Sequence, residues 1–139
     1  MRYSYPAGRR AVLGLLGVAS GLAVAVLAAA PALADGLAGS WSGNGSVVMP
    51  SGETEKARCK VSFSKAGGKS YGMNAVCATS SARVSQSALL QQVGPNRFAG
   101  DFTNPEYGVS GSINVTLNGN SLSASLHGGG ASAFFNLSR

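Results

Sequence analysis

The sequence predicts an all-β domain, an eight-stranded antiparallel meander that closes into a barrel, downstream of an N-terminal export signal. Three observations support this. Apolar and polar residues alternate through nearly the whole chain after residue 34, turn-forming residues interrupt the alternation at short intervals, and two cysteines lie at equal distances from Gly68. Alternation with a period of two is typical of strands that bury one face, whereas no sustained helical stripe follows the leader. A two-layer sandwich of the same strands is the alternative fold.

Residues 1–34 have the three-part layout of a secretory signal peptide. Three arginines precede an uncharged apolar stretch over residues 11–30, and Ala32-Leu33-Ala34 supplies a small-x-small cleavage pattern. We therefore predict cleavage before Asp35, a periplasmic or secreted location, and a single mature domain over residues 35–139. The apolar stretch is also long enough for an uncleaved membrane anchor, but the cleavage pattern and the helix-breaking proline before it favour removal of the leader.

Cys59 and Cys77 predict a disulfide across a β-hairpin. If the chain turns at Gly67-Gly68-Lys69 and returns antiparallel, the two cysteines face each other at a distance that a disulfide can bridge. Two cysteines in an exported chain leave one intramolecular pairing. The register that this pairing implies also places Phe63 opposite Met73, so that apolar residues meet apolar residues along both strands.

Eight strands are expected in chain order. Seven lie at approximately residues 40–49, 53–65, 70–79, 82–93, 97–103, 109–117 and 121–127, and the last follows Gly130 and presents Ala133, Phe135 and Leu137 on one face. The turns between them are rich in glycine, asparagine and proline, and residues 104–108 form the longest connection in the second half of the chain. Strand interiors also contain Gly43, Gly45, Gly100 and Gly111, which permit sharp bends and close backbone approach. Such curvature, and the absence of exposed edges in a closed sheet, favour the barrel over the sandwich.

The barrel interior is expected to be mostly packed, with at best a shallow apolar mouth, because eight strands leave just enough width for side chains. Small residues at Ala75, Ala124 and Gly111 leave room for a modest cavity. Opposite faces carry serine, asparagine, threonine and basic residues, which predicts a water-soluble barrel and no stable membrane insertion after cleavage. The residues expected to face inward are Trp41, Val47, Phe63, Met73, Val84, Phe98, Phe102, Ile113, Val115, Leu117, Leu122, Leu126, Phe135 and Leu137.

The charge pattern does not indicate a nucleic-acid-binding surface. Loss of the leader removes three of the eleven basic residues and no acidic ones, which leaves an excess of about three positive charges. Lys56, Arg58 and Lys60 alternate along one strand, and we interpret them as a solvated face; a weak docking patch for an acidic partner is the alternative.

No residue pattern in the mature chain predicts catalysis, a metal site or a cofactor. His127 is the only histidine, and we expect it to be exposed at a hairpin mouth. Glu53 and Glu55 lie two residues apart on one strand face, as a carboxylate pair in a glycosidase might, but charges at the start of a strand more often provide solubility. We therefore predict that the protein is not an enzyme.

Asn104, Pro105, Glu106 and Tyr107 form a candidate contact loop. Aromatic and polar residues on a protruding turn suit recognition of a partner. The alternative is a wide turn with Tyr107 folded back over the barrel end.

Gly39-Ser40-Trp41 at the start of the first expected strand resembles the G-x-W motif of the lipocalin-like superfamily. That resemblance implies an eight-stranded barrel in which Trp41 plugs one end. The chain also resembles small bacterial periplasmic metalloprotease inhibitors, which share the barrel, an early tryptophan and one disulfide, and Cys59-Lys60-Val61-Ser62-Phe63 looks like their cysteine region. Its layout is further similar to uncharacterised small exported β-barrel proteins of alphaproteobacteria.

Together, these features predict a non-enzymatic exported binding module that acts through its surface and loops on another exported protein, in the manner of a protease inhibitor. The alternative is a lipocalin-like carrier of a small apolar ligand. A structure without an interior cavity would exclude the carrier, since a ligand site typically needs a few hundred cubic ångströms.

Overall fold

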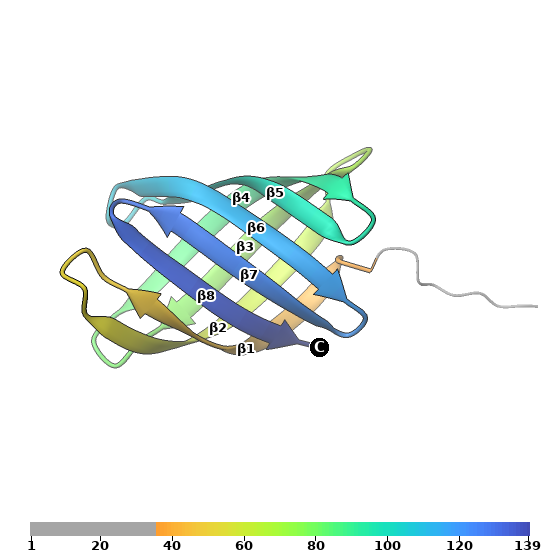
Figure 1. Ribbon diagram of the computed structural model, residues 1–139. Coiled ribbons are helices and arrows are strands. Elements are labelled where there is room, and N and C mark those ends of the chain that lie inside the picture. Colours follow the sequence, from red (N-terminus) through yellow and green to blue (C-terminus); the bar gives the residue numbers. More distant parts are fainter. Residues whose placement is uncertain (1–35) are drawn as a thin grey trace, which may run out of the picture. The chain divides into compact units, whose positions relative to one another are not determined.

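Each strand pairs antiparallel with the strands before and after it, and β8 pairs with β1, which closes the barrel (Figure 1). The computed structural model describes residues 36–139, so the predicted signal peptide over residues 1–34 lies outside the described residues. The strands are β1 (Gly39–Val48), β2 (Thr54–Lys65), β3 (Ser70–Ala78), β4 (Arg83–Gly94), β5 (Arg97–Asn104), β6 (Val109–Asn118), β7 (Ser121–Gly128) and β8 (Ala131–Ser138). The predicted eight-stranded meander barrel is confirmed, and the sandwich alternative is wrong. Within residues 36–139, no helix has the length and apolar character to span a membrane.

The strands are staggered around the barrel, and this stagger sets their tilt. A path that follows paired residues from Gly39 on β1 reaches Ala131 on β8 after one circuit. On β8 the next residue, Ser132, pairs with Val48 of β1, so Ala131 lies opposite Met49. The closed path therefore ends ten residues further along the chain than Gly39, where it began. This offset corresponds to a strand tilt of about 40°, at which an eight-stranded barrel can be filled by side chains or hold one small ligand.

The two ends of the barrel differ. We call one the closed end; it carries the β2–β3, β4–β5 and β6–β7 turns, residues 36–38 and Arg139. The other, which we call the open end, carries the β1–β2, β3–β4, β5–β6 and β7–β8 turns. Figure 1 shows the C-terminus beside the start of β1, at the closed end.

Trp41 and Leu37 fill the closed end. Both side chains are buried, and the Trp41 indole N–H donates a hydrogen bond to the carbonyl oxygen of Leu37 at 2.9 Å. The Arg139 guanidinium lies 4.4 Å from the centre of the Trp41 ring and donates to the carbonyl oxygen of Ala38 at 2.9 Å. The first and last described residues of the domain are thereby tied together across the barrel end.

Inward-facing residues form one core that extends through the barrel. Every residue predicted to face inward is buried or partly buried against this core. Sequence reasoning missed Tyr71 and Leu90, which are also buried; Tyr71 packs edge-to-face on Phe98 with ring centres 5.3 Å apart. On β4 the polar residue Gln86 also faces inward, so the alternation of apolar and polar residues is interrupted there. This alternation alone therefore did not show which face of β4 points into the barrel.

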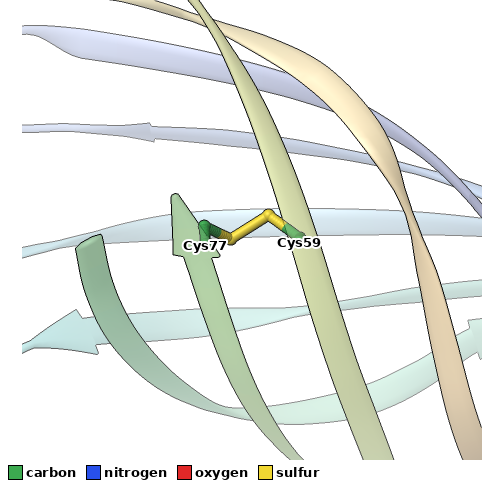
Figure 2. Close-up of a disulfide and its surroundings, with 2 residues drawn as sticks. All are labelled: Cys59 and Cys77. Carbon is green, nitrogen blue, oxygen red and sulfur yellow. A yellow bond between two sulfur atoms is a disulfide. The ribbon is translucent and has the colours of Figure 1, made fainter. Parts of the chain in front are cut away.

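The disulfide between Cys59 and Cys77 bridges β2 and β3, as predicted (Figure 2). The two cysteines are directly paired, with a Cα–Cα distance of 4.1 Å, and both side chains are buried inside the barrel. Phe63 lies opposite Met73, so the predicted register of this hairpin is confirmed.

Glycines within the strands allow the backbones to approach closely. A Cβ on Gly43 or Gly45 would overlap a carbonyl oxygen of β8, and one on Gly100 would overlap the carbonyl oxygen of Leu89 on β4. All three positions face inward. The close backbone approach predicted at these glycines is therefore confirmed.

We predict that removal of the disulfide lowers stability without changing the fold. The Cys59→Ala/Cys77→Ala variant should lose about 3 kcal/mol of unfolding free energy, because the unfolded chain gains the entropy of an open loop. Urea denaturation of the variant and the oxidised parent measures this difference. The far-ultraviolet circular dichroism spectra of the two proteins should agree, and a count of two free thiols in the exported parent would contradict the disulfide.

We also predict that alanine is tolerated at one strand glycine and not at another. Gly100→Ala should lower the unfolding free energy by about 2 kcal/mol or more, since the new methyl group must displace the β4 backbone. Gly72→Ala on β3 is the matched control, because the nearest atom outside its chain neighbours would lie 3.7 Å from the added Cβ. Its effect should stay within about 1 kcal/mol. Equal destabilisation of both variants in urea denaturation would show that steric overlap is not the cause.

Candidate ligand-binding cavity

A cavity of about 370 Å³ lies inside the open end of the barrel, away from Trp41. All eight strands contribute inward-facing residues to its wall, and the turns at the open end form its rim. The strand residues that line it are Val47, Glu55, Ala57, Cys77, Val84, Gln86, Phe102, Asn104, Val109, Leu126, Gly128, Ala131, Ser132, Ala133 and Phe135. The wall is thus mainly apolar; its polar strand residues are Glu55, Gln86, Asn104 and Ser132, and Thr79 and Ser81 add hydroxyl groups after β3.

The cavity exists because small residues occupy inward positions in the open half of the barrel. Ala57, Ala131 and Ala133 face inward there, whereas the closed half holds bulky side chains such as Phe63 and Tyr71. The expected packed core is therefore found in the closed half. In the open half the interior is larger than the shallow mouth that we expected.

The floor of the cavity is formed by well-buried side chains. Phe102, Leu126 and Phe135 line the cavity and are each less than 10 % exposed, as is Cys77 of the disulfide. Beneath them, the middle of the barrel contains a void of only about 20 Å³. Packing thus separates the cavity from the closed end, and a ligand would enter through the open end.

Glu55 places a carboxylate at the cavity mouth. It has the same inward phase on β2 as Ala57 and Cys59, and it is half-buried. The Ser81 hydroxyl, from the β3–β4 turn, lies 2.9 Å and 3.2 Å from the two carboxylate oxygens and donates to them. Sequence reasoning grouped Glu55 with Glu53 as solubilising charges, but Glu53 precedes β2, is exposed and does not line the cavity.

Two amide side chains lie next to each other in the wall between β4 and β5. Gln86 and Asn104 occupy inward positions beside the paired residues Ser87 and Thr103. Asn104 is the buried polar residue of the described core, and its side-chain oxygen accepts a hydrogen bond from the backbone N–H of Tyr107 at 3.4 Å. These amides offer hydrogen-bonding groups to a ligand within an otherwise apolar wall.

The candidate contact loop is divided between the cavity and the solvent. Asn104 and Tyr107 line the cavity, whereas Pro105 and Glu106 are exposed and do not. Tyr107 is 58 % exposed, so one side of its ring faces water and another faces the mouth. The loop therefore forms part of the cavity rim. This arrangement resembles the second of the two predicted alternatives, in which a wide turn places Tyr107 at the barrel end.

The remaining candidate residues lie outside this site. His127 is exposed on the outer face of β7, between Ser112 and Ser132 of the neighbouring strands, in accordance with the prediction. Lys56, Arg58 and Lys60 are exposed on the outer face of β2. Neither group contributes to the cavity wall.

Comparisons with known proteins identify the fold. No family model matches the sequence, and no curated protein matches it either.

Among solved structures, EF1p2_mFAP2b bound to DFHBI superposes with a TM-score of 0.65 and 13 % identity, covering 74 % of this chain and 93 % of that one. The redesigned β-barrel mFAP1 bound to DFHBI gives a TM-score of 0.63 and 12 % identity, covering 74 % of this chain and 94 % of that one. A de novo designed fluorescence-activating β-barrel gives a TM-score of 0.59 and 12 % identity, covering 76 % of this chain and 95 % of that one. At these identities the similarity concerns the barrel fold alone.

Proposed function

We propose that the protein is an exported, non-catalytic binding protein for a small apolar molecule, held in the cavity at the open end of the barrel. The cavity itself is the observation that carries this proposal. Its volume of about 370 Å³ falls within the range of small-molecule sites, and its wall has the usual composition of such sites, apolar side chains with a few polar groups.

The cavity volume limits the size of the ligand. If each non-hydrogen atom of a ligand takes roughly 30 Å³, the volume of one water molecule in the liquid, the cavity has room for about twelve such atoms. Phe102 and Phe135 provide aromatic surface against which a chain or a ring can pack. Burial of an eight-carbon chain contributes at most about 6 kcal/mol at 0.8 kcal/mol per methylene, which corresponds to a Kd of the order of 10–100 μM.

The solved barrels support a ligand-binding role by analogy. Two of them, mFAP1 and EF1p2_mFAP2b, are described as bound to DFHBI. A barrel of this architecture can therefore hold a small molecule. The analogy extends to the fold only, and the identity of the ligand has to come from the residues of this chain.

The geometry favours the carrier alternative over the protein-contact hypothesis that the sequence placed first. Two of the four residues of the expected contact loop, Asn104 and Tyr107, form part of the cavity wall. The described cavity wall contains no histidine, lysine or free thiol, and we therefore propose binding rather than catalysis. The predicted leader and the disulfide support an extracytoplasmic location.

We predict that the protein binds 1-octanol in this cavity and that a bulky residue there abolishes binding. Ala133→Phe adds a ring to the cavity and should reduce affinity at least tenfold, because the added ring occupies the ligand's volume. Titration followed by amide chemical shifts measures both the affinity and the location. Shifts should concentrate on residues of the open end, such as Leu126 and Phe135, and be absent from the Trp41 indole.

Ala78→Phe is the matched control, because Ala78 is exposed on the outer face of β3, next to the cavity-lining Cys77. It should bind 1-octanol like the parent. Each variant is first tested by thermal denaturation, so that loss of binding is not confused with loss of folding. Lack of saturable binding of 1-octanol to the folded parent would overturn the proposed function.

A further inference from the structure

We infer that the natural ligand is an amphipathic amine, whose apolar body fills the cavity and whose protonated amino group binds Glu55 at the mouth. This inference rests on the proposed function and specifies the chemical class of its ligand. Its structural basis is Glu55, a carboxylate on the inner face of β2, where the barrel fold does not require a charged residue. The buried positions that follow on this face of β2 are all apolar: Ala57, Cys59, Val61 and Phe63.

Glu55 is the charged residue of the described cavity wall, and that wall contains no lysine or arginine. The basic residues nearest in sequence, Lys56 and Arg58, face outward on the other side of the sheet. A half-buried carboxylate beside apolar surface has lost part of its hydration, and a cation in contact with it would compensate for that loss. The cavity therefore favours positive charge at its mouth and disfavours negative charge.

The carboxylate is held in place from one side. The Ser81 hydroxyl donates to it from across the end of β3, and the turn that carries Ser81 is fixed by Thr79, whose hydroxyl oxygen accepts the N–H groups of Ser81 and Ala82 at 3.2 Å and 3.1 Å. A carboxylate has about four acceptor positions. One hydroxyl donor leaves acceptor capacity for the three N–H groups of an ammonium ion.

The rest of the wall matches the other part of such a ligand. From Glu55 the cavity continues past Ala57 to the apolar floor at Phe102, Leu126 and Phe135. A molecule with its charge at one end and a short hydrocarbon body can thus satisfy both parts at once. A fatty acid of the same length would place its carboxylate near that of Glu55, which is unfavourable.

A matched series of ligands tests this inference: octylamine, 1-octanol and octanoate share one chain length and differ in the head group. At pH 7 the parent should bind octylamine about tenfold more tightly than 1-octanol, and octanoate more weakly than 1-octanol. Glu55→Gln keeps an acceptor for Ser81 but removes the charge. It should abolish the preference, so that the variant binds octylamine no more tightly than it binds 1-octanol.

Glu53→Gln is the control, since it removes one negative charge at the same end of the barrel from a residue outside the cavity wall. It should retain the preference for octylamine. Equal binding of the three ligands by the parent, or an equal loss of preference in both variants, would overturn the amine inference while the proposed function stands. Failure of all three ligands to bind would instead overturn the proposed function.

Discussion

Closure of the sheet is the constraint on which the rest of the structure depends. A meander of eight strands leaves two unpaired edges unless its first and last strands meet, and here β1 and β8 pair from Ser42 to Val48. That pairing brings the backbones so close that a side chain at Gly43 or Gly45 would overlap β8. Glycine at these positions lets the sheet close, and closure creates an interior whose contents then depend on side-chain size.

Side-chain volume along the barrel axis determines what the interior can do. Trp41, Phe63 and Tyr71 fill the closed half, and Leu37 seals it. Alanines and glycines occupy many inward positions of the open half, where the same barrel diameter leaves about 370 Å³ unfilled. Gly128 on β7 adds to this space, because it lines the cavity and carries no side chain into the barrel.

Sequence reasoning predicted the fold well, because alternation and turn chemistry are local and each strand pairs with its neighbours in the chain. It found all eight strands, the first seven to within one residue at each end, and the Cys59–Cys77 register. It left room for a modest cavity at Ala75, Ala124 and Gly111, but none of these residues lines the cavity found. The position of an unfilled volume depends on residues from all eight strands at one level of the barrel. Glu55 was assigned to the surface because it is charged. It lies two residues before the buried Ala57 on the same strand, and this spacing already indicated that Glu55 faces the barrel interior. Asn104 was identified as a loop residue, but it is the last residue of β5, where it pairs with Val109 and has the same inward phase as Phe102.

The position of the disulfide bears on how the cavity would bind. Cys77 lies in the floor, and its bond to Cys59 links β2 to β3 (Figure 2). Glu55 and Ala57 precede Cys59 at alternate positions of β2. On the rim above, the Ser81 hydroxyl joins the β3–β4 turn to Glu55 on β2. The wall that carries the carboxylate is thus restrained covalently from below and by a hydrogen bond from above. A site held in this way is formed before the ligand arrives, so little ordering of the protein has to accompany binding. The same restraint would keep the carboxylate at the mouth when the cavity is empty, where the proposed amine would meet it first.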